Sequence, residues 1–421
     1  MPFQALFRQL NNPFITLSNP SYRVYWLATC VSAIGIWMQN AAQPWLVYSM
    51  TDSPLLLGIV SSVQFLPLFL FSLFAGVLID RFPKKQVFMI TQTTAALLSF
   101  IMFLLVYSSR VEYWHIFTIA FLMGTVNAIN LPLRQVFINE LVHKEHLMNA
   151  VALYSAAFNF ARIIGPALAG FIMAWLGIGI CYFINGLTFL LMAGSLFFIN
   201  TKAAEEKPLV SHVVFADVKD GLSYALNNRQ VRDMLFVLAV TGTFAINFSV
   251  LLPVLAYKVI GQKEIGFGFL MSTVGIGTFL GAFTIAASSK TGPRQLFLFK
   301  APLIMGVLLI LIGVCRQDYL IYISLALMGF FYVGFSSTIN TALQIHAPSE
   351  FIGRIMSLYN LVLVGTSPLG NLFSGAIANH YGVGWGFIAC GLGVFISYEL
   401  YFSKRVTLFM KKTANKKPSS K

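Results

Sequence analysis

Long apolar stretches alternate with short polar connections along the whole chain. A helix needs about 20 apolar residues to cross a bilayer, and stretches of this length recur from residue 23 onward. The pattern predicts twelve membrane-spanning helices, at residues 23–50, 54–79, 87–108, 114–141, 147–175, 177–199, 231–258, 265–288, 295–315, 318–346, 352–380 and 382–403. Several exceed the minimum length, which allows for tilt or for extension beyond the lipid.

The longest polar stretch, residues 200–230, lies between the sixth and seventh predicted spans. Within it Val214, Val218, Leu222 and Leu226 recur every fourth residue, which predicts one apolar face of a short amphipathic helix. We therefore expect an all-α membrane protein with four parts. They are an N-terminal six-helix bundle at 1–199, a cytoplasmic linker with an amphipathic helix at 200–230, a C-terminal six-helix bundle at 231–403 and a basic cytoplasmic tail at 404–421.

The two halves of the chain repeat one another at a shift of 205 residues. Seven of the ten glycines in the first 204 residues fall on glycines of the second half. The matches are Gly76 with Gly281, Gly124 with Gly329, Gly165 with Gly370, Gly170 with Gly375, Gly177 with Gly382, Gly179 with Gly384 and Gly186 with Gly391. The repeat predicts two pseudo-symmetric bundles joined by a linker, an arrangement found in secondary transporters. Glycines fit this picture because small residues allow close contact between membrane helices.

Composition excludes several classes of protein. Of the 421 residues, 57% are hydrophobic and only 10% are charged, whereas a soluble domain carries about 25% charged residues. An ordinary soluble enzyme, a disordered chain and a secreted disulfide scaffold are therefore ruled out. The net charge of +14 leaves two explanations, which are a nucleic-acid partner and the positive-inside bias of a membrane protein.

The placement of the basic residues decides between these explanations. If the N-terminus is cytoplasmic, 22 Lys and Arg residues lie at inner loops and tails, and four lie in outer loops. This asymmetry predicts that both termini are cytoplasmic and removes the need for a nucleic-acid partner. It also lets anionic lipid hold the basic tail. We expect an integral protein of the bacterial inner membrane that is complete as a monomer.

Three motifs resemble those of the major facilitator superfamily. The loop after the second span, residues 76–85, reads GVLIDRFPKK and is similar to the superfamily's loop signature, with Pro83 in place of a glycine. Span five contains Gly165-Pro166 and Gly170, similar to a motif of exporters and antiporters. The stretch 131–170 resembles the branch that includes the enterobactin exporter and the macrolide efflux proteins.

The resemblance implies a major facilitator fold that works by alternating access, with gating residues in these motifs. The implied gating set is Gly76, Asp80, Arg81, Lys84, Lys85, Gly165, Pro166 and Gly170. Asp80 would face the N-terminus of span eleven, near residues 352–358, where a helix presents unpaired N–H groups and partial positive charge. This contact would hold the outward-open state. The alternative is that Asp80 only pairs with Lys84.

Arg162 is the most informative single residue, because it lies near the middle of span five. A charge at that depth is costly, so Arg162 should face the interior and find partners. Several uncharged side chains are predicted at similar depth, and the resemblance places spans one, four, seven and ten around a central cavity. The cavity candidates are Arg162, Trp37, Gln39, Asn40, Gln43, Asn127, Asn130, Asn159, Asn247, Asn340, Gln344 and Asn360. For each amide the alternative is interhelix hydrogen bonding, and for Arg162 it is a purely structural tie.

No acidic residue lies near the centre of any predicted span. A cationic substrate would find no carboxylate there, whereas Arg162 favours an anion or a neutral polar molecule. The resemblance implies proton coupling, for which the candidates are Asp80, Glu140 and Glu399. Arg134, nearer the inner end of span four, is expected to extend its side chain toward the cytoplasm.

These observations predict a secondary active transporter that exports an anionic or neutral organic molecule, siderophore-like or drug-like, in exchange for protons. The alternatives are an importer of a metabolite or siderophore, a lysophospholipid flippase and a non-transporting receptor. The chain has no Walker, HExxH or GxSxG motif and no Cys/His ligand set. We therefore expect no enzyme activity, no cofactor and no metal site.

Overall fold

The structure, a computed structural model, describes residues 14–199, 222–287, 296–348 and 351–414, without the side chains of 72–77, 80 and 402–414. Over these residues the protein consists of helices joined by short connections. The first half contains η1 (Ile15–Ser18), α2 (Pro20–Thr51), α3 (Pro54–Arg81), α4 (Lys84–Tyr107), α5 (Tyr113–Leu141), η2 (Lys144–His146), α6 (Leu147–Leu176), α7 (Ile178–Ser195) and η3 (Leu196–Phe198). The second half contains α9 (Arg229–Phe244), α10 (Phe248–Leu255), the π-helix η4 (Ala256–Ile260), α11 (Lys263–Ala287), the π-helix η6 (Leu296–Lys300), α12 (Ala301–Val314), α13 (Asp318–His346), α14 (Ile352–Gly365), α15 (Ser367–Tyr381) and α16 (Val383–Ala414).

Each predicted span corresponds to one helix or to one pair of consecutive helices. Eleven of the described helical segments are long and apolar enough to cross a membrane. The segment that falls short is α2, although it has 32 residues, because Gln39, Asn40 and Gln43 dilute its apolar character. With α9–α10 and α14–α15 each counted as one crossing, the chain forms the twelve helices that the pattern predicts.

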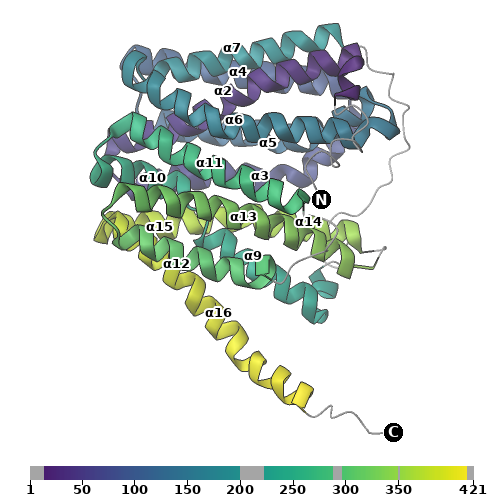
Figure 1. Cartoon of the computed structure of the whole chain (residues 1–421). Helices are drawn as coiled ribbons and strands as arrows, with labels where there is room; N and C mark the ends of the chain where they lie inside the picture. The colour runs from purple at the N-terminus through teal and green to yellow at the C-terminus, as the bar shows by residue number, and fades with distance from the viewer. Residues whose placement is uncertain (1–13, 200–221, 288–295, 349–350, 415–421) are drawn as a thin grey trace, which may run out of the picture.

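The helices form two bundles of six, one from each half of the chain. In Figure 1 most first-half helices, purple to teal, lie in the upper part of the view and most second-half helices, green to yellow, lie in the lower part, with α3, α10 and α11 at the level between them. Within the first bundle α2 packs on α6 and α7, α3 on α5, and α4 on α7. Within the second, α11 packs on α13 and α12 on α16. The bundles meet mainly along two helix pairs, α6 with α11 and α3 with α15.

Matched glycines occupy equivalent places in the two bundles. Gly165 of α6 packs against Trp37 of α2, and Gly370 of α15 packs against the backbone of α9. Both pairs join the fifth helix of a bundle to its first. Gly177 and Gly382 both take positive φ angles, 87° and 91°, which a side chain would strain. The predicted pseudo-symmetry is confirmed at this level of detail.

Two predicted spans, the seventh and the eleventh, are broken, which corrects the expectation of continuous helices there. Span seven stops at Phe244 and restarts at Phe248. At the break Asn247 donates to the Thr243 carbonyl at 2.9 Å, and such side-chain capture competes with helix bonds. Span eleven divides at Thr366, just before Pro368, because proline cannot continue the preceding turn. The predicted tail at 404–421 also changes, since α16 continues to Ala414, while most of the linker at 200–230 lies outside the described residues.

Buried apolar side chains form three clusters that reveal how the bundles meet. We call the face where α2 begins and α16 ends the terminal face, and the opposite face, with the α2–α3 connection, the distal face. One cluster joins both bundles and includes Trp45, Leu57, Leu251 and Phe267. A second cluster lies wholly in the second bundle and a third wholly in the first, each toward the terminal face. The shared core is therefore distal.

Candidate functional site

The two bundles contact each other backbone to backbone in the distal half. A Cβ atom placed on Gly58 of α3 would lie 2.5 Å from the Asn371 carbonyl oxygen of α15. One placed on Gly268 of α11 would lie 2.5 Å from the Pro166 carbonyl oxygen of α6. Gly170 of α6 also meets α11, since its Cβ would lie 2.8 Å from the Glu264 carbonyl oxygen. The distal ends are therefore closed against each other without room for side chains.

An ion pair and an aromatic cluster cover this closed end. Asp52, in the α2–α3 connection, lies 3.2 Å from the Lys258 ammonium of η4. The Tyr48 hydroxyl and the Lys258 ammonium hold the pKa of the Asp52 carboxyl below its usual value. Trp45 stacks on Phe267 of α11 at 5.5 Å between ring centroids, so aromatic rings of both bundles meet directly beneath the ion pair.

Arg162 lies where four helices from both bundles converge. Its guanidinium lies over the ring of Trp37 in α2, 4.9 Å from the ring centroid. Its backbone abuts Gly275 of α11, whose Cβ would lie 2.9 Å from the Arg162 carbonyl oxygen. Tyr332 of α13 lies within electrostatic range of the guanidinium. The structure thus brings Arg162 and Trp37 together at the junction between the bundles.

Two N–H donors at this junction lack a hydrogen-bond acceptor. The Nε atom of Arg162 and the Nε1 atom of Trp37 are both buried without a hydrogen-bond acceptor. None of the described acidic side chains forms an ion pair with Arg162. Two buried N–H donors without acceptors, one of them on a cation, are costly. A carboxylate, phosphate or carbonyl oxygen placed here would satisfy both groups.

Three of the predicted cavity amides form hydrogen bonds inside the first bundle. The Oε1 atom of Gln39 accepts from Ser99 at 3.0 Å and from Asn185 at 2.6 Å. Asn130 accepts from Thr91 at 2.7 Å, and Gln43 donates to Gln64 at 3.2 Å. For these amides the contacts match the alternative of interhelix hydrogen bonding.

The other predicted amides are spread over several environments. Asn159 bonds within α6, to the Ser155 carbonyl oxygen, and Asn247 bonds at the break in span seven. Gln344 donates to Asn340 on α13 at 2.7 Å, and Gln344 is exposed. The rest form no hydrogen bond with other described residues, and these are the half-buried Asn40 and Asn127 and the exposed Asn360.

The motif residues of the α3–α4 connection gather at the terminal face. Lys84 forms an ion pair with Glu140 of α5 at 2.8 Å, and Lys85 donates to the Ile199 carbonyl oxygen at 2.9 Å. Arg81 is exposed, with its guanidinium 5.9 Å from the centroid of the Phe82 ring. Gly76 and Asp80 belong to α3, but their side-chain environment lies outside the described part of the structure. Glu399 is exposed on α16.

Arg134 corrects one expectation. Instead of extending toward the terminal face, its side chain is buried, with 7% of the residue exposed. Sequence reasoning also missed Tyr332, Gly268 and Gly275, because their roles depend on the docking of the second bundle onto α6. The signal for the two glycines in the sequence is the run of glycines in span eight, at positions 266, 268, 275, 277 and 281, and it does not extend to Tyr332.

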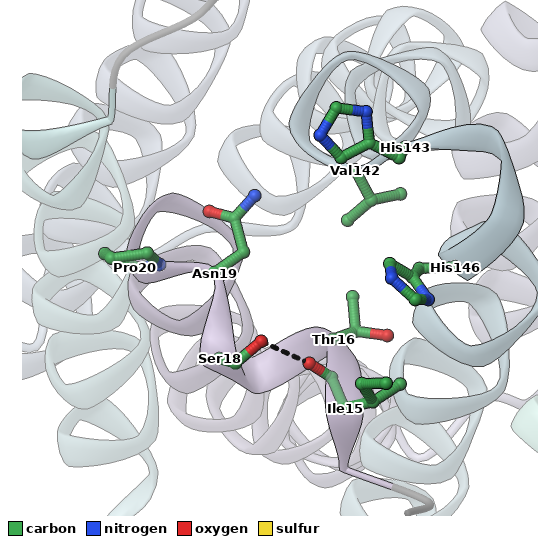
Figure 2. A pocket seen from close by; sticks show the side chains of 8 residues that line it. All are labelled: Ile15, Thr16, Ser18, Asn19, Pro20, Val142, His143 and His146. Carbon is green, nitrogen blue, oxygen red and sulfur yellow. Dashed lines mark hydrogen bonds between the residues drawn. The ribbon is translucent and has the colours of Figure 1, made fainter. Parts of the chain in front are cut away.

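A surface pocket lies elsewhere. It has a volume of about 370 Å³ and is lined at the terminal face by the η1 segment and by the α5–α6 connection. Figure 2 shows His143 and His146 across the opening from Ser18 and Asn19. All its lining residues belong to the first bundle, so it does not lie between the bundles. Among the described residues, no group of three or more His, Cys, Asp or Glu residues could hold a metal ion.

Comparison with known proteins decides the family. A family model described as transmembrane secretion effector matches residues 11–421. The chain belongs to this family of the major facilitator superfamily. It is 27% identical to a staphyloferrin A transporter of Staphylococcus aureus over 88% of this chain and 93% of that protein. It is 26% identical to the multidrug efflux pump Tap of Mycolicibacterium fortuitum over 87% of this chain and 91% of that protein.

Solved structures agree on the fold. The crystal structure of a point mutant of the nucleoside transporter NupG superposes with a TM-score of 0.71 over 90% of this chain and 99% of that chain, at 13% identity. The predicted major facilitator fold is therefore confirmed. The protein is an integral membrane transporter of the superfamily and not an enzyme.

Proposed function

We propose that this transporter exports an anionic or neutral organic molecule, siderophore-like or drug-like, by alternating access. The observation that carries the proposal is Arg162, a half-buried cation whose Nε atom is buried and which has no acidic partner among the described residues, at the junction of the two bundles. An anionic group of a substrate would supply the missing acceptor, and Trp37 would add a flat apolar surface for the rest of the molecule. The names of the two sequence relatives, a staphyloferrin A transporter and a multidrug efflux pump, are consistent with this range of substrates.

The orientation that we assign to the chain is consistent with export. The excess of Lys and Arg on the terminal face favours placing that face, with both termini, in the cytoplasm of a bacterial inner membrane. In that orientation the closed distal end faces outward and the separated cores face the cytoplasm. The described conformation would then be the one that loads substrate from the cytoplasm, and the protein would act as a monomer.

We further propose that protons drive the export. Asp80, Glu140 and Glu399 are the candidate proton carriers, since no carboxylate lies near the middle of a span. Glu140 already has a cationic neighbour, Lys84, so protonation of Glu140 would release a contact between α4 and α5. That coupling of charge to helix contact is what a proton-driven step requires.

Flux into proteoliposomes under an imposed proton gradient tests the proposal. The probes are an organic anion (carboxyfluorescein), a neutral drug (chloramphenicol) and a lysophospholipid. We expect gradient-dependent flux of the anion. We also expect it to fall about tenfold or more in Arg162→Ala, since a hydrogen bond to a charged group contributes about 1.5–3 kcal/mol. Arg23→Gln, which removes an exposed charge from the same bundle, is the matched control and should keep full flux.

Each remaining outcome assigns a different function. Gradient-dependent flux in the opposite direction only would mean an importer, and movement of the lysophospholipid alone would mean a flippase. Absence of flux of every probe, with the protein folded, would favour a non-transporting receptor. Wild-type anion flux in Arg162→Ala would remove the role proposed for Arg162.

A further inference from the structure

Arg134 of α5 is a second arginine whose guanidinium lies over an aromatic ring of a neighbouring helix and whose Nε atom is buried without an acceptor. Its guanidinium lies over the ring of Phe158 in α6, 5.5 Å from the ring centroid. Only 7% of the residue is exposed, and its Nε atom is buried without an acceptor. None of the described acidic side chains forms an ion pair with Arg134. Arg134 is therefore a buried cation that only an aromatic ring approaches.

The side chains around Arg134 supply further hydrogen-bond donors and, among the described residues, no carboxylate. Tyr25 of α2 packs its ring on Phe137, at 5.6 Å between centroids, and its hydroxyl lies within electrostatic range of Arg134. Thr29 follows Tyr25 by one helical turn, on the same face of α2. The hydroxyl oxygens of Tyr25 and Thr29 are both buried, and among the described residues each has only the other as a nearby hydrogen-bonding group. Three donor groups from two helices thus converge without an anion to share.

Arg134 and Arg162 lie at two levels of one wall. The Arg134 guanidinium lies over the ring of Phe158, which precedes Arg162 by about one turn of α6. The levels of the two arginines are therefore about 6 Å apart along the helix axis. The wall is formed by α2 and α6, which pack side by side. Trp26 of α2 donates to the Leu153 carbonyl oxygen at 3.0 Å, and Trp37 abuts Gly165. The level of Arg134 is the one nearer the terminal face.

A purely structural role does not account for this arrangement. An aromatic face can balance part of a cationic charge, but it leaves the buried Nε–H group of the guanidinium without an acceptor, and the two hydroxyl groups can satisfy only each other, which is costly for buried donors. A carboxylate has two oxygens and about four lone-pair positions. One carboxylate could therefore accept from Arg134, Tyr25 and Thr29 together.

We propose that Arg134, Tyr25 and Thr29 form a second anion-binding site, which holds one acid group of the substrate while Arg162 holds another. This inference rests on the proposed transport function and narrows its substrate class to organic polyanions with acid groups several bonds apart. A molecule with a single acid group would occupy Arg162 alone. Inorganic phosphate could satisfy the same donors, so the experiment separates the two sources of the anion.

Calorimetric titration of the purified chain, in nanodiscs of zwitterionic phosphatidylcholine, tests the second site. The probes are adipate and hexanoate, which have the same chain length and carry two and one carboxylates. We expect adipate to bind about tenfold more tightly than hexanoate, because the second carboxylate gains charged hydrogen bonds. In Arg134→Gln this difference should disappear while hexanoate affinity stays unchanged. In Arg162→Gln the binding of both acids should weaken.

Further variants keep the test decisive. Tyr25→Phe removes one hydroxyl and should reduce the preference for adipate about threefold, which also decides the question if Arg134→Gln does not fold. Arg23→Gln, on the exposed side of α2, should leave both affinities unchanged.

Two outcomes would overturn the inference. The first is equal binding of adipate and hexanoate by the wild type, with Arg134→Gln unchanged. The second is phosphate binding that depends on Arg134 without any preference for adipate, which would assign the site to a free inorganic anion. Because titration measures binding without transport, intact adipate preference in a protein that moves no probe across the membrane would refute the transport function alone.

Discussion

The distal and terminal ends of the molecule hold the two bundles in different ways. At the distal end, glycines let α3 meet α15 and α6 meet α11 at backbone distance, and one apolar core runs through both bundles. At the terminal end each bundle has its own core. The ion pair described there, Lys84 with Glu140, stays within one bundle. The distal end has a core shared by both bundles, and the terminal end has not.

This difference indicates how the fold can alternate between closure at the distal end and closure at the terminal end. Contact between small residues is close, but each contact contributes little by itself, so opening the distal interface costs mainly the separation of apolar side chains such as Trp45 and Phe267. The terminal end carries no such glycine contact among the residues described. Instead, the motif at 76–85 predicts an acid-to-helix contact there, from Asp80 to the start of α14 near Ile352. A packing-based closure and a charge-based closure would then compete.

The largest expected effect comes from overpacking the distal closure. In Gly58→Leu the new side chain would collide with the Asn371 carbonyl oxygen of α15, since even a Cβ atom would lie 2.5 Å away. Overpacking costs about 1–3 kcal/mol, so we expect the distal-open fraction to rise about tenfold and transport to fall. The measurement is the rate at which an impermeant maleimide, added at the distal side, labels Asn40→Cys in a background without the native cysteines.

Gly194→Leu provides the matched control, because a Cβ atom at Gly194 meets no atom within 4 Å. Its labelling rate should equal that of the parent. If Gly58→Leu labels at the parent rate and still transports, the distal glycines do not set the closure.

The sequence was sufficient for the architecture. Apolar length placed twelve crossings, and the shift of 205 residues matched Gly177 to Gly382, which share the same positive φ. Periodicity and glycine spacing are properties of single helices and of their repeats, so they can be recognised without coordinates. The break at Asn247 was missed because Asn breaks a membrane helix only when its side chain captures a nearby carbonyl group. The break at Thr366 was missed because a proline such as Pro368 does not always interrupt a membrane helix, as Pro166 inside α6 shows.

The site was predictable only in part. Arg162 could be identified because a charge in the middle of an apolar span is unusual in any sequence. Its partner Trp37 was among the candidates, but Tyr332 was not, since nothing in span ten marks the face that will meet α6. Gln39 and Asn130 were candidates by depth alone, and depth does not determine whether an amide faces the cavity or a neighbouring helix. The sequence does not give the rotation of each helix about its own axis, and this rotation decides which way these side chains point.

An intermediate effect is expected at the terminal end, with the opposite sign. Asp80→Asn keeps the shape of the side chain and removes the charge that would interact with the start of α14. A charge at a helix N-terminus contributes about 0.3–1 kcal/mol, and up to ~2 kcal/mol when partly buried. We expect the distal-open state to become about two- to tenfold rarer, so Asn40→Cys should label more slowly from the distal side. Lys84→Gln is the comparison, because the alternative interpretation, a local Asp80–Lys84 pair, predicts the same change in both variants.

The smallest expected effect concerns the ion pair over the distal closure. The Asp52 carboxylate lies 3.2 Å from the Lys258 ammonium, and both side chains are well exposed. An exposed pair contributes about 0.2–1 kcal/mol, so Asp52→Asn should raise distal labelling of Asn40→Cys by less than about fivefold.

The direction of the pH dependence follows from linkage. The pKa of Asp52 is lowered from 3.8 while the distal end is closed and returns toward that value when the end opens. The contribution of the pair is therefore complete above pH 3.8 and is lost as the pH falls through the lowered pKa. Labelling followed from about pH 7 to about pH 3 should rise only at the acid end in the parent and stay level in Asp52→Asn, after correction for the intrinsic pH dependence of the maleimide reaction. A parallel acid rise in both proteins would assign the pH dependence to another group and leave the glycine contacts as the main determinant of distal closure.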